Sequence, residues 1–116
     1  MIIKNPKDVP AVDVEMEGVK DARVQVLFGP HDNAPTFAMR IFTLGPGGHT
    51  PYHDHPFEHE VMILNGQLGV TTPDSVIPVH PGDVLLIHPG ETHQFQNLSI
   101  TDTAEFMCLV PIAHQN

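Results

Sequence analysis

Three histidines, His53, His55 and His59, fall within one short segment and are the residues in this sequence best suited to hold a metal ion. In an extended segment, residues i and i+2 point to the same face, so His53 and His55 can direct their imidazoles at one point. Pro56 then interrupts the strand, and His59 opens the next apolar segment. Converging neutral imidazoles suit a first-row divalent metal. Exposed loop histidines with no metal would have the same spacing, so the cluster alone leaves both interpretations open.

Acidic residues next to this cluster offer further ligands or supports. Glu60 is the alternative metal ligand, but alternation along a strand places it opposite His59, where a partner on a neighbouring strand is expected. Asp54 and Glu58 are either exposed loop acids, which is the commoner case, or hydrogen-bond partners that orient the metal-binding imidazoles. Four other histidines share no such spacing and are expected at the surface: His31, His49, His80 and His114.

Several apolar strand residues are candidates to line a cavity around the site, namely Phe37, Met39, Phe95, Phe106 and Cys108. Ordinary core packing explains them equally well, because Phe, Met and Cys are commonly buried. Arg40 stands alone between apolar neighbours. It either clamps a substrate carboxylate or faces solvent or an ion-pair partner, and we favour the second placement. No nucleophile triad, phosphate-binding glycine loop or cysteine-based catalytic motif accompanies these residues.

Short strands joined by turns must position these side chains, because twelve prolines and nine glycines interrupt the chain throughout. Asn65-Gly66 lies between two apolar runs and predicts a tight hairpin, since both residues tolerate positive φ. The expected strands are Val24–Phe28, Phe37–Leu44, Val61–Leu64, Gln67–Thr72, Val76–Val79, Val84–Ile87, Gln94–Asn97 and Ala104–Val110. This spacing predicts an all-β sandwich or closed barrel. The strand order cannot be read from it.

The length of 116 residues predicts a single domain over residues 1–116. Residues 1–22 mix acids with isolated valines, which indicates an N-terminal arm or edge strand, followed by a barrel at residues 24–110. From this arm and its apolar start, Met1-Ile2-Ile3, we expect a homodimer.

The charge and cysteine content narrow the possible partners and location. A formal net charge of −9 argues against nucleic acid, because neutralising phosphates requires clustered Lys and Arg. Cys108 is the single cysteine, so no intrachain disulfide can form. No run approaches the roughly 20 apolar residues of a membrane span, and the N-terminus lacks a secretory core. We therefore expect a cytoplasmic protein with a small-molecule substrate and no membrane or nucleic-acid partner.

Two motifs in this chain resemble those of the cupin superfamily. The first spans residues 47–66 and consists of Gly47, His53-Asp54-His55, His59 and Gly66; the second spans residues 82–97 and consists of Gly82, His88-Pro89-Gly90, His93 and Asn97. His59 occupies the slot where cupins usually carry a glutamate ligand, and His88 stands where the family often has proline. Residues 34–60 and 105–111 also look like the small single-domain cupins with a tetra-histidine, manganese-type site.

The resemblance implies a double-stranded β-helix, or jelly-roll cupin barrel, and one divalent metal held by four histidines: His53, His55, His59 and His93. It favours Mn, then Fe, with Zn, Ni or Cu as alternatives. Four neutral ligands would leave the ion its full charge, and octahedral geometry would leave two positions for water, substrate or dioxygen. The expected function is a dioxygenase-type oxidoreductase that uses O2 or peroxide on a small organic substrate. A non-catalytic sensor or small-ligand binding barrel and a cupin isomerase or lyase are the alternatives.

Overall fold

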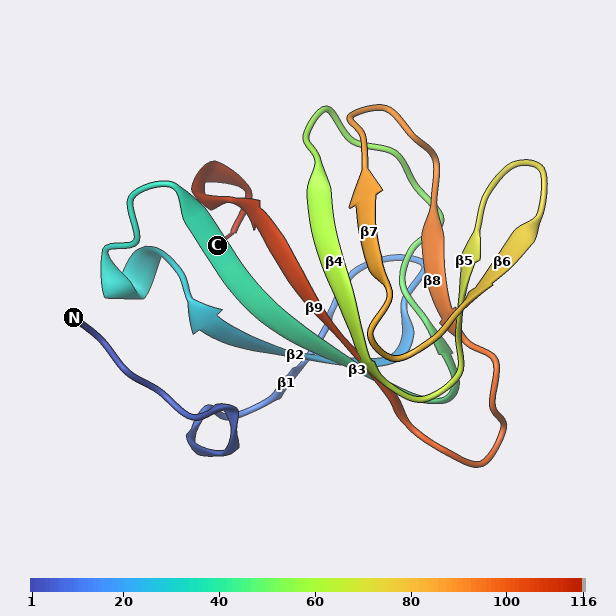
Figure 1. Ribbon diagram of the computed structural model, residues 1–116, viewed down its shortest axis with the longest axis horizontal. Helices are drawn as coiled ribbons and strands as arrows, with labels where there is room; N and C mark the ends of the chain where they lie inside the picture. Colours follow the sequence, from blue (N-terminus) through green and yellow to red (C-terminus); the bar gives the residue numbers. More distant parts are fainter. Residues whose placement is uncertain (116) are drawn as a thin grey trace.

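The chain forms a curled sheet of nine strands, and the computed structural model describes residues 1–115 (Figure 1). The strands are β1 (Val12–Asp13), β2 (Lys20–Phe28), β3 (Phe37–His49), β4 (His59–Asn65), β5 (Leu68–Thr71), β6 (Val76–Val79), β7 (Val84–Ile87), β8 (Gln94–Asn97) and β9 (Ala104–Pro111). Three short 3-10 turns accompany them: η1 (Pro6–Asp8), η2 (Pro30–Asp32) and η3 (Ile112–His114). No helix in residues 1–115 has the length and apolar character that crossing a membrane requires.

The strand order is β6-β5-β8-β3-β9-β4-β7, with β2 added beside β3 and β1 beside β2, and every pairing is antiparallel. This confirms the predicted fold class: an all-β barrel of the jelly-roll, double-stranded β-helix type. β3 contributes to three ladders, with β2, with β9 and, at its end, with β8. The barrel is therefore built around one long strand.

The core fills the inside of the curled sheet because inward and outward residues alternate along each strand. On β9 the buried positions are Ala104, Phe106, Cys108 and Val110, and the residues between them are half-buried. Leu44, Ile63 and Leu68 add fully buried side chains from β3, β4 and β5. The interior is thus apolar on the strands that carry the candidate cavity residues.

The hairpin predicted at Asn65-Gly66 is wrong, although the tight turn itself is present. β4 pairs with β7 and β9, whereas β5 pairs with β6 and β8, so the two strands joined by this turn are not neighbours. Gly66 has a φ of +87°, and a Cβ there would lie 2.7 Å from the Cα of Ala104. The turn therefore carries the chain across the barrel, and only glycine fits it.

Two strands extend beyond their predicted bounds. β2 begins at Lys20, not Val24, and β3 continues to His49 through the Gly-rich segment expected to end it. The ladder explains this, because Lys20 pairs with His49 at the far end of both strands. A Cβ on Gly48 would lie 2.6 Å from the carbonyl oxygen of Asp21, so glycine here permits close approach of β2.

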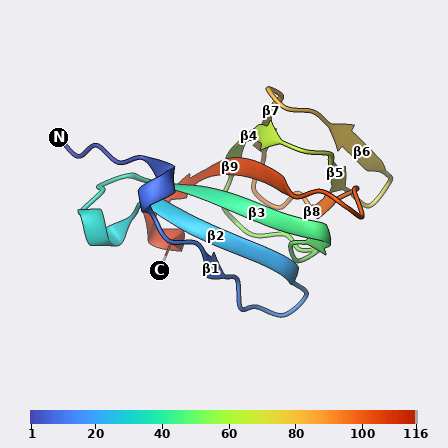
Figure 2. The ribbon, with the colours of Figure 1, turned by 90° about the horizontal axis from the view of Figure 1, so that it is seen from below.

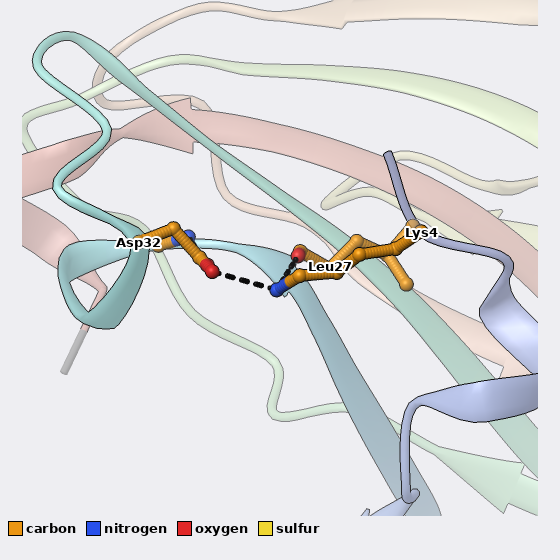
Figure 3. A network of polar contacts seen from close by, with 4 residues as sticks. Lys4, Leu27 and Asp32 are labelled. Carbon is orange, nitrogen blue, oxygen red and sulfur yellow. Dashed lines mark hydrogen bonds and ion pairs between the residues drawn. The ribbon is translucent and has the colours of Figure 1, made fainter. Parts of the chain in front are cut away.

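The N-terminal arm, residues 1–22, lies along β2 of its own chain (Figure 2). The Lys4 ammonium donates to the carbonyl oxygen of Leu27 at 2.8 Å and to Asp32 Oδ1 at 2.7 Å (Figure 3). The hydrogen bond from Lys4 is the main reason that the pKa of Asp32 lies below its usual value. The Gln25 side-chain amide donates to the carbonyl oxygens of Pro6 and Val9. The arm is therefore anchored within the subunit.

Candidate metal centre

Three histidines bring their ring nitrogens together at one end of the barrel. His53 and His55 lie in the loop between β3 and β4, and His93 directly precedes β8. One ligand atom from each lies within 4.8 Å of the others. The backbones of His53 and His93 fix this arrangement through two hydrogen bonds, of 3.1 and 2.9 Å, between their N–H and C=O groups.

Backbone carbonyls determine which nitrogen two of these rings present. Nδ1 of His55 lies 2.7 Å from the carbonyl oxygen of Phe57, and Nδ1 of His93 lies 2.7 Å from that of Glu91. A carbonyl accepts only from N–H, so each ring carries its proton on Nδ1 and presents an unprotonated Nε2. Histidines that bind a metal through one ring nitrogen commonly donate the N–H of the other nitrogen to such an acceptor.

The Nε2 atom of His55 is buried and has no hydrogen-bond partner among the described residues. A buried polar atom without a partner costs free energy that a bound cation would recover. Three converging imidazole nitrogens, two of them on rings whose tautomer is fixed by a backbone carbonyl, match the preferences of a first-row divalent metal. The residues therefore fit a metal ion.

His59 lies beside this group, with its Nδ1 turned towards a sulfur atom. It opens β4, and its ring centroid is 4.4 Å from that of His55 and 5.5 Å from that of His93. Its Nδ1 lies 3.1 Å from Sγ of Cys108. The metal-ligand group of donor atoms within 4.8 Å comprises three histidines and does not include His59. The four predicted ligands are thus neighbours, three of them with converging donor atoms.

Burial favours the neutral form of His53, His55 and His59. Desolvation is the largest cause lowering the pKa of His53 and His55 below the usual value of 6.5, and it lowers that of His59 to about 3. The neighbouring imidazoles and Arg40 lower the pKa of His59 further. Neutral imidazole is the form that binds metal, so the site is prepared for a cation in mildly acidic solution.

A cavity of about 610 Å³ opens over these rings. Its walls include all four candidate histidines and the predicted pocket residues Arg40, Phe95, Phe106 and Cys108. Phe37, which was a candidate from sequence, is 66% exposed and lies outside this lining, as does Met39. The cavity combines an aromatic wall with one permanently charged basic residue.

Arg40 does not take the solvent or ion-pair position that the sequence analysis favoured. It shares the interior face of β3 with Phe42, and its cross-strand partner on β9 is Cys108. Its Nη2 donates to Sγ of Cys108 at 3.1 Å, and the guanidinium lies 4.8 Å from the centre of the Phe42 ring. No carboxylate pairs with it in residues 1–115. Strand alternation, which turns Arg40 inwards, explains the difference.

The acids near the histidines lie apart from the ring nitrogens. Asp54 and Glu58 are exposed, and the contacts to His55 and His93 come from backbone carbonyls, not from these carboxylates. Glu60 is exposed on the face of β4 opposite the buried His59, as alternation predicts. The donor atoms that converge at the site therefore come from imidazoles, not from carboxylates.

Two aromatic residues at the cavity escaped the sequence analysis. The Phe57 ring stacks between the imidazoles of His55 and His114, with centroids 3.9 and 3.8 Å away. His114, expected at the surface, is exposed but lines the cavity from η3. His49 is half-buried and contacts the Gln94 amide, so its predicted surface position is wrong, whereas the exposure of His114 agrees with the prediction. No local pattern marks these positions, because they depend on how distant segments meet.

Comparisons with known proteins agree with this geometry. Residues 40–110 match the model of the Cupin domain family. The chain is 36% identical over 86 residues to 1-methylthio-D-xylulose 5-phosphate methylsulfurylase of Rhodospirillum rubrum, covering 74% of this chain and 53% of that protein. It is 32% identical over 72 residues to (R)-mandelonitrile lyase of Granulicella tundricola, covering 61% and 54%. The chain thus spans about half the length of these curated relatives.

Among solved structures, the polyketide cyclase RemF from Streptomyces resistomycificus superposes with a TM-score of 0.91. That structure is 32% identical in sequence, and the match covers 97% of this chain and 80% of that chain. A cupin 2 domain-containing protein from Halorhodospira halophila is 33% identical with a TM-score of 0.74, covering 89% and 74%. The similarity therefore extends over nearly the whole barrel and the site.

Proposed function

The chain belongs to the Cupin domain family, and from this premise we propose that it is a metal-dependent enzyme acting on a small organic molecule in the barrel cavity. The observation that carries the proposal is the convergence of three imidazoles at the floor of a cavity of about 610 Å³. A cavity with few convergent polar groups is the usual form of a small-molecule site. The net charge of −9 supports a small-molecule ligand over nucleic acid.

We propose His53, His55, His59 and His93 as the ligands of one divalent transition metal, with Mn preferred over Fe. Two observations support this set. The Nε2 atom of His55 is buried without a hydrogen-bond partner among the described residues, and a metal ion would supply one. The low pKa of His59 favours its neutral form, which is the form that binds metal. When bound, Mn or Fe supplies Lewis acidity and electron exchange with O2 or a peroxide. The chain's own residues orient the ligand rings, exclude water with aromatic walls and bind the substrate.

The leading reaction class is oxidation of a small substrate by O2 or peroxide, of the dioxygenase type. A second class, non-oxidative bond cleavage or cyclisation, is supported by the names of the relatives, which are a methylsulfurylase, a lyase and a cyclase. Fold similarity alone does not decide between them, because one barrel supports many chemistries.

Metal content tests the ligand set. We expect about one Mn per chain by elemental analysis, with His53→Ala and His93→Ala each reducing Mn affinity at least roughly tenfold. His80→Ala is the matched control, because His80 is exposed, pairs with Asp83 and lies outside the cavity. Wild-type affinity in both cavity variants would reject the site.

Replacing His59 tests the fourth ligand. His59→Ala should weaken Mn retention, whereas His59→Glu should keep the metal and lower the positive charge at the centre. Unchanged Mn affinity in His59→Ala would leave a three-histidine site.

Turnover separates the reaction classes. O2 or peroxide consumption by Mn- and Fe-loaded protein, measured against diketones, enols, catechols and arylalkenes, supports the oxidoreductase when the metal-free protein is inactive. Product formation without oxidant consumption supports the second class. Stoichiometric metal and saturable ligand binding without turnover would indicate a binding barrel in place of an enzyme.

A further inference from the structure

Of the described residues that line the cavity, Arg40 is the only one with a permanent positive charge. Asp13 and Glu15 also line it, but both are exposed and lie on the N-terminal segment at its outer edge. Asp13 is 3.5 Å from the guanidinium of Arg23, so it already has a basic partner outside the cavity. Arg40 is half-buried on the inner face of β3. The cavity therefore has an acidic rim and a basic residue within.

No acidic side chain among the described residues 1–115 neutralises the charge of Arg40. Its partners are the sulfur of Cys108, which is a weak acceptor, and the face of the Phe42 ring. Its Nε is shielded from solvent and has no hydrogen-bond partner among the described residues. Partly buried guanidinium groups are ordinarily matched by carboxylate or phosphate, because their desolvation is costly. Among residues 1–115, therefore, no carboxylate pairs with Arg40.

Arg40 also lies next to the metal-binding rings. Its Nη2 and Nδ1 of His59 each lie 3.1 Å from the same sulfur atom, Sγ of Cys108. Imidazoles carry no negative charge, so they cannot offset either the guanidinium or a bound cation. An oxyanion between Arg40 and the histidine cluster would be attracted by the guanidinium and, in the metal-loaded protein, also by the bound cation.

The wall beside Arg40 suits a flat apolar group. Phe42 and Phe106 stack with centroids 5.2 Å apart, and Phe106 and Phe95 stack with centroids 4.4 Å apart. All three rings line the cavity. A ligand with an aromatic or similarly planar body and an acidic group would bury the former on these rings and pair the latter with Arg40.

We propose that the substrate is an organic oxyanion, a carboxylate or a phosphate monoester, and that Arg40 is the residue that binds its acidic group. This inference rests on the proposed function, since it places the substrate in the same cavity. Arg40 acts here as a substrate-binding residue. If it served only to hold Cys108 and His59 in place, its loss would alter stability and metal affinity but not the preference for anions.

Three probes of similar shape test the inference by isothermal titration calorimetry: benzoate, phenyl phosphate and neutral benzamide. Each is titrated into the metal-free and the Mn-loaded protein. We expect wild type to bind benzoate or phenyl phosphate at least about tenfold more tightly than benzamide in both forms, as charge-assisted hydrogen bonds require. The tighter of the two anions identifies the acidic group.

Metal-free Arg40→Gln should bind all three probes with similar affinity, and the variant should still bind Mn. Arg40→Lys should recover part of the preference through its point charge. Lys7→Gln is the control, because it removes one positive charge at an exposed residue outside the cavity lining. It should leave the preference unchanged.

Equal binding of benzoate, phenyl phosphate and benzamide by wild type, or no binding of any, overturns the inference. So does an anion preference that survives in metal-free Arg40→Gln. Because the metal-free protein is titrated separately, a protein that prefers anions without binding Mn would contradict the proposed function and leave the role of Arg40 intact. A protein that binds Mn without preferring anions would contradict the role of Arg40 and leave the proposed function intact.

Discussion

The sulfur of Cys108 lies 3.1 Å from Nδ1 of His59 and connects a strand in the barrel wall to the candidate metal centre. In two other histidines of the site, His55 and His93, a backbone carbonyl takes the place of this sulfur as the contact that orients the ring. A backbone carbonyl is retained in every variant, whereas a thiol can be replaced. The orientation of His59 is therefore the one most open to change by mutation.

Cys108→Ala should lower the free energy of unfolding by about 1–3 kcal/mol, because it leaves Nδ1 of His59 and Nη2 of Arg40 without a partner inside the barrel. Cys108→Ser supplies a hydroxyl that can both donate and accept, so its loss should be smaller. Urea unfolding followed by circular dichroism measures both values. Equal losses in the two variants would show that only the volume of the sulfur matters.

Metal-free protein should become less stable as the pH falls from about 6.5 towards 3. Burial lowers the pKa of His59 from 6.5 to about 3, so the unfolded chain binds a proton over this interval and the folded chain does not. The contribution of His59 to the free energy of unfolding is complete above pH 6.5 and is lost as the pH falls towards 3. His53 and His55 act in the same direction.

Unfolding measured at several pH values checks this dependence. In His59→Gln the slope between pH 6.5 and 3 should be smaller, and in His80→Ala, where the ring is exposed, it should match wild type. A slope that persists undiminished in His59→Gln would contradict the assignment.

The crossing turn after β4 should depend on glycine. Gly66→Ala forces a methyl group to within 2.7 Å of Ala104 at a positive φ, and it should cost about 3 kcal/mol. Gly82 also has a positive φ, +93°, but a Cβ there meets nothing within 4 Å. Gly82→Ala should therefore cost only about 1 kcal/mol. Comparable costs by urea unfolding would mean that contact with Ala104 contributes little.

We expect a homodimer, and the outer face of β4 and β7 offers apolar residues for it. Val84 is 72% exposed, and Leu86 and Met62 on the same surface are also exposed. Such a patch is typical of an interface. Light scattering at micromolar concentration should give twice the subunit mass. Leu86→Glu should yield a monomer, and Ile100→Glu, at a lone exposed residue elsewhere, should not.

A monomeric wild-type protein, unchanged by deletion of residues 1–10, would reject the dimer. Because the arm is anchored to its own β2 through Lys4, that deletion should lower stability more than it alters assembly.

Strand positions were predictable where turn residues lie close on both sides. The ranges Val76–Val79 and Val84–Ile87 agree with the structure, because Pro, Gly and Asp lie close to their ends. The range Gln94–Asn97 also agrees. The neighbours of each strand were not predictable. Asn65-Gly66 fixes a turn, but the choice of β7 and β9 as partners of β4 depends on distant segments.

The candidate site divides in the same way. His53 and His55 could be paired from their spacing, and His93 from the family motif, since these signals are local. The inward position of Arg40 and the stacking of His114 on Phe57 could not, because they require β9 and the C-terminal turn to be placed. Long-range contacts determined what local patterns left open.

The central strand β3 has a consequence for how the molecule opens. It hydrogen-bonds to β2 and β9 along most of its length and meets β8 at His49, so its departure breaks three ladders at once. Without β3, the strands β2, β8 and β9 each lose a hydrogen-bonded neighbour. Unfolding should thus be a single cooperative transition, and the amide protons shared by β3 and β9 should be the last to exchange with solvent.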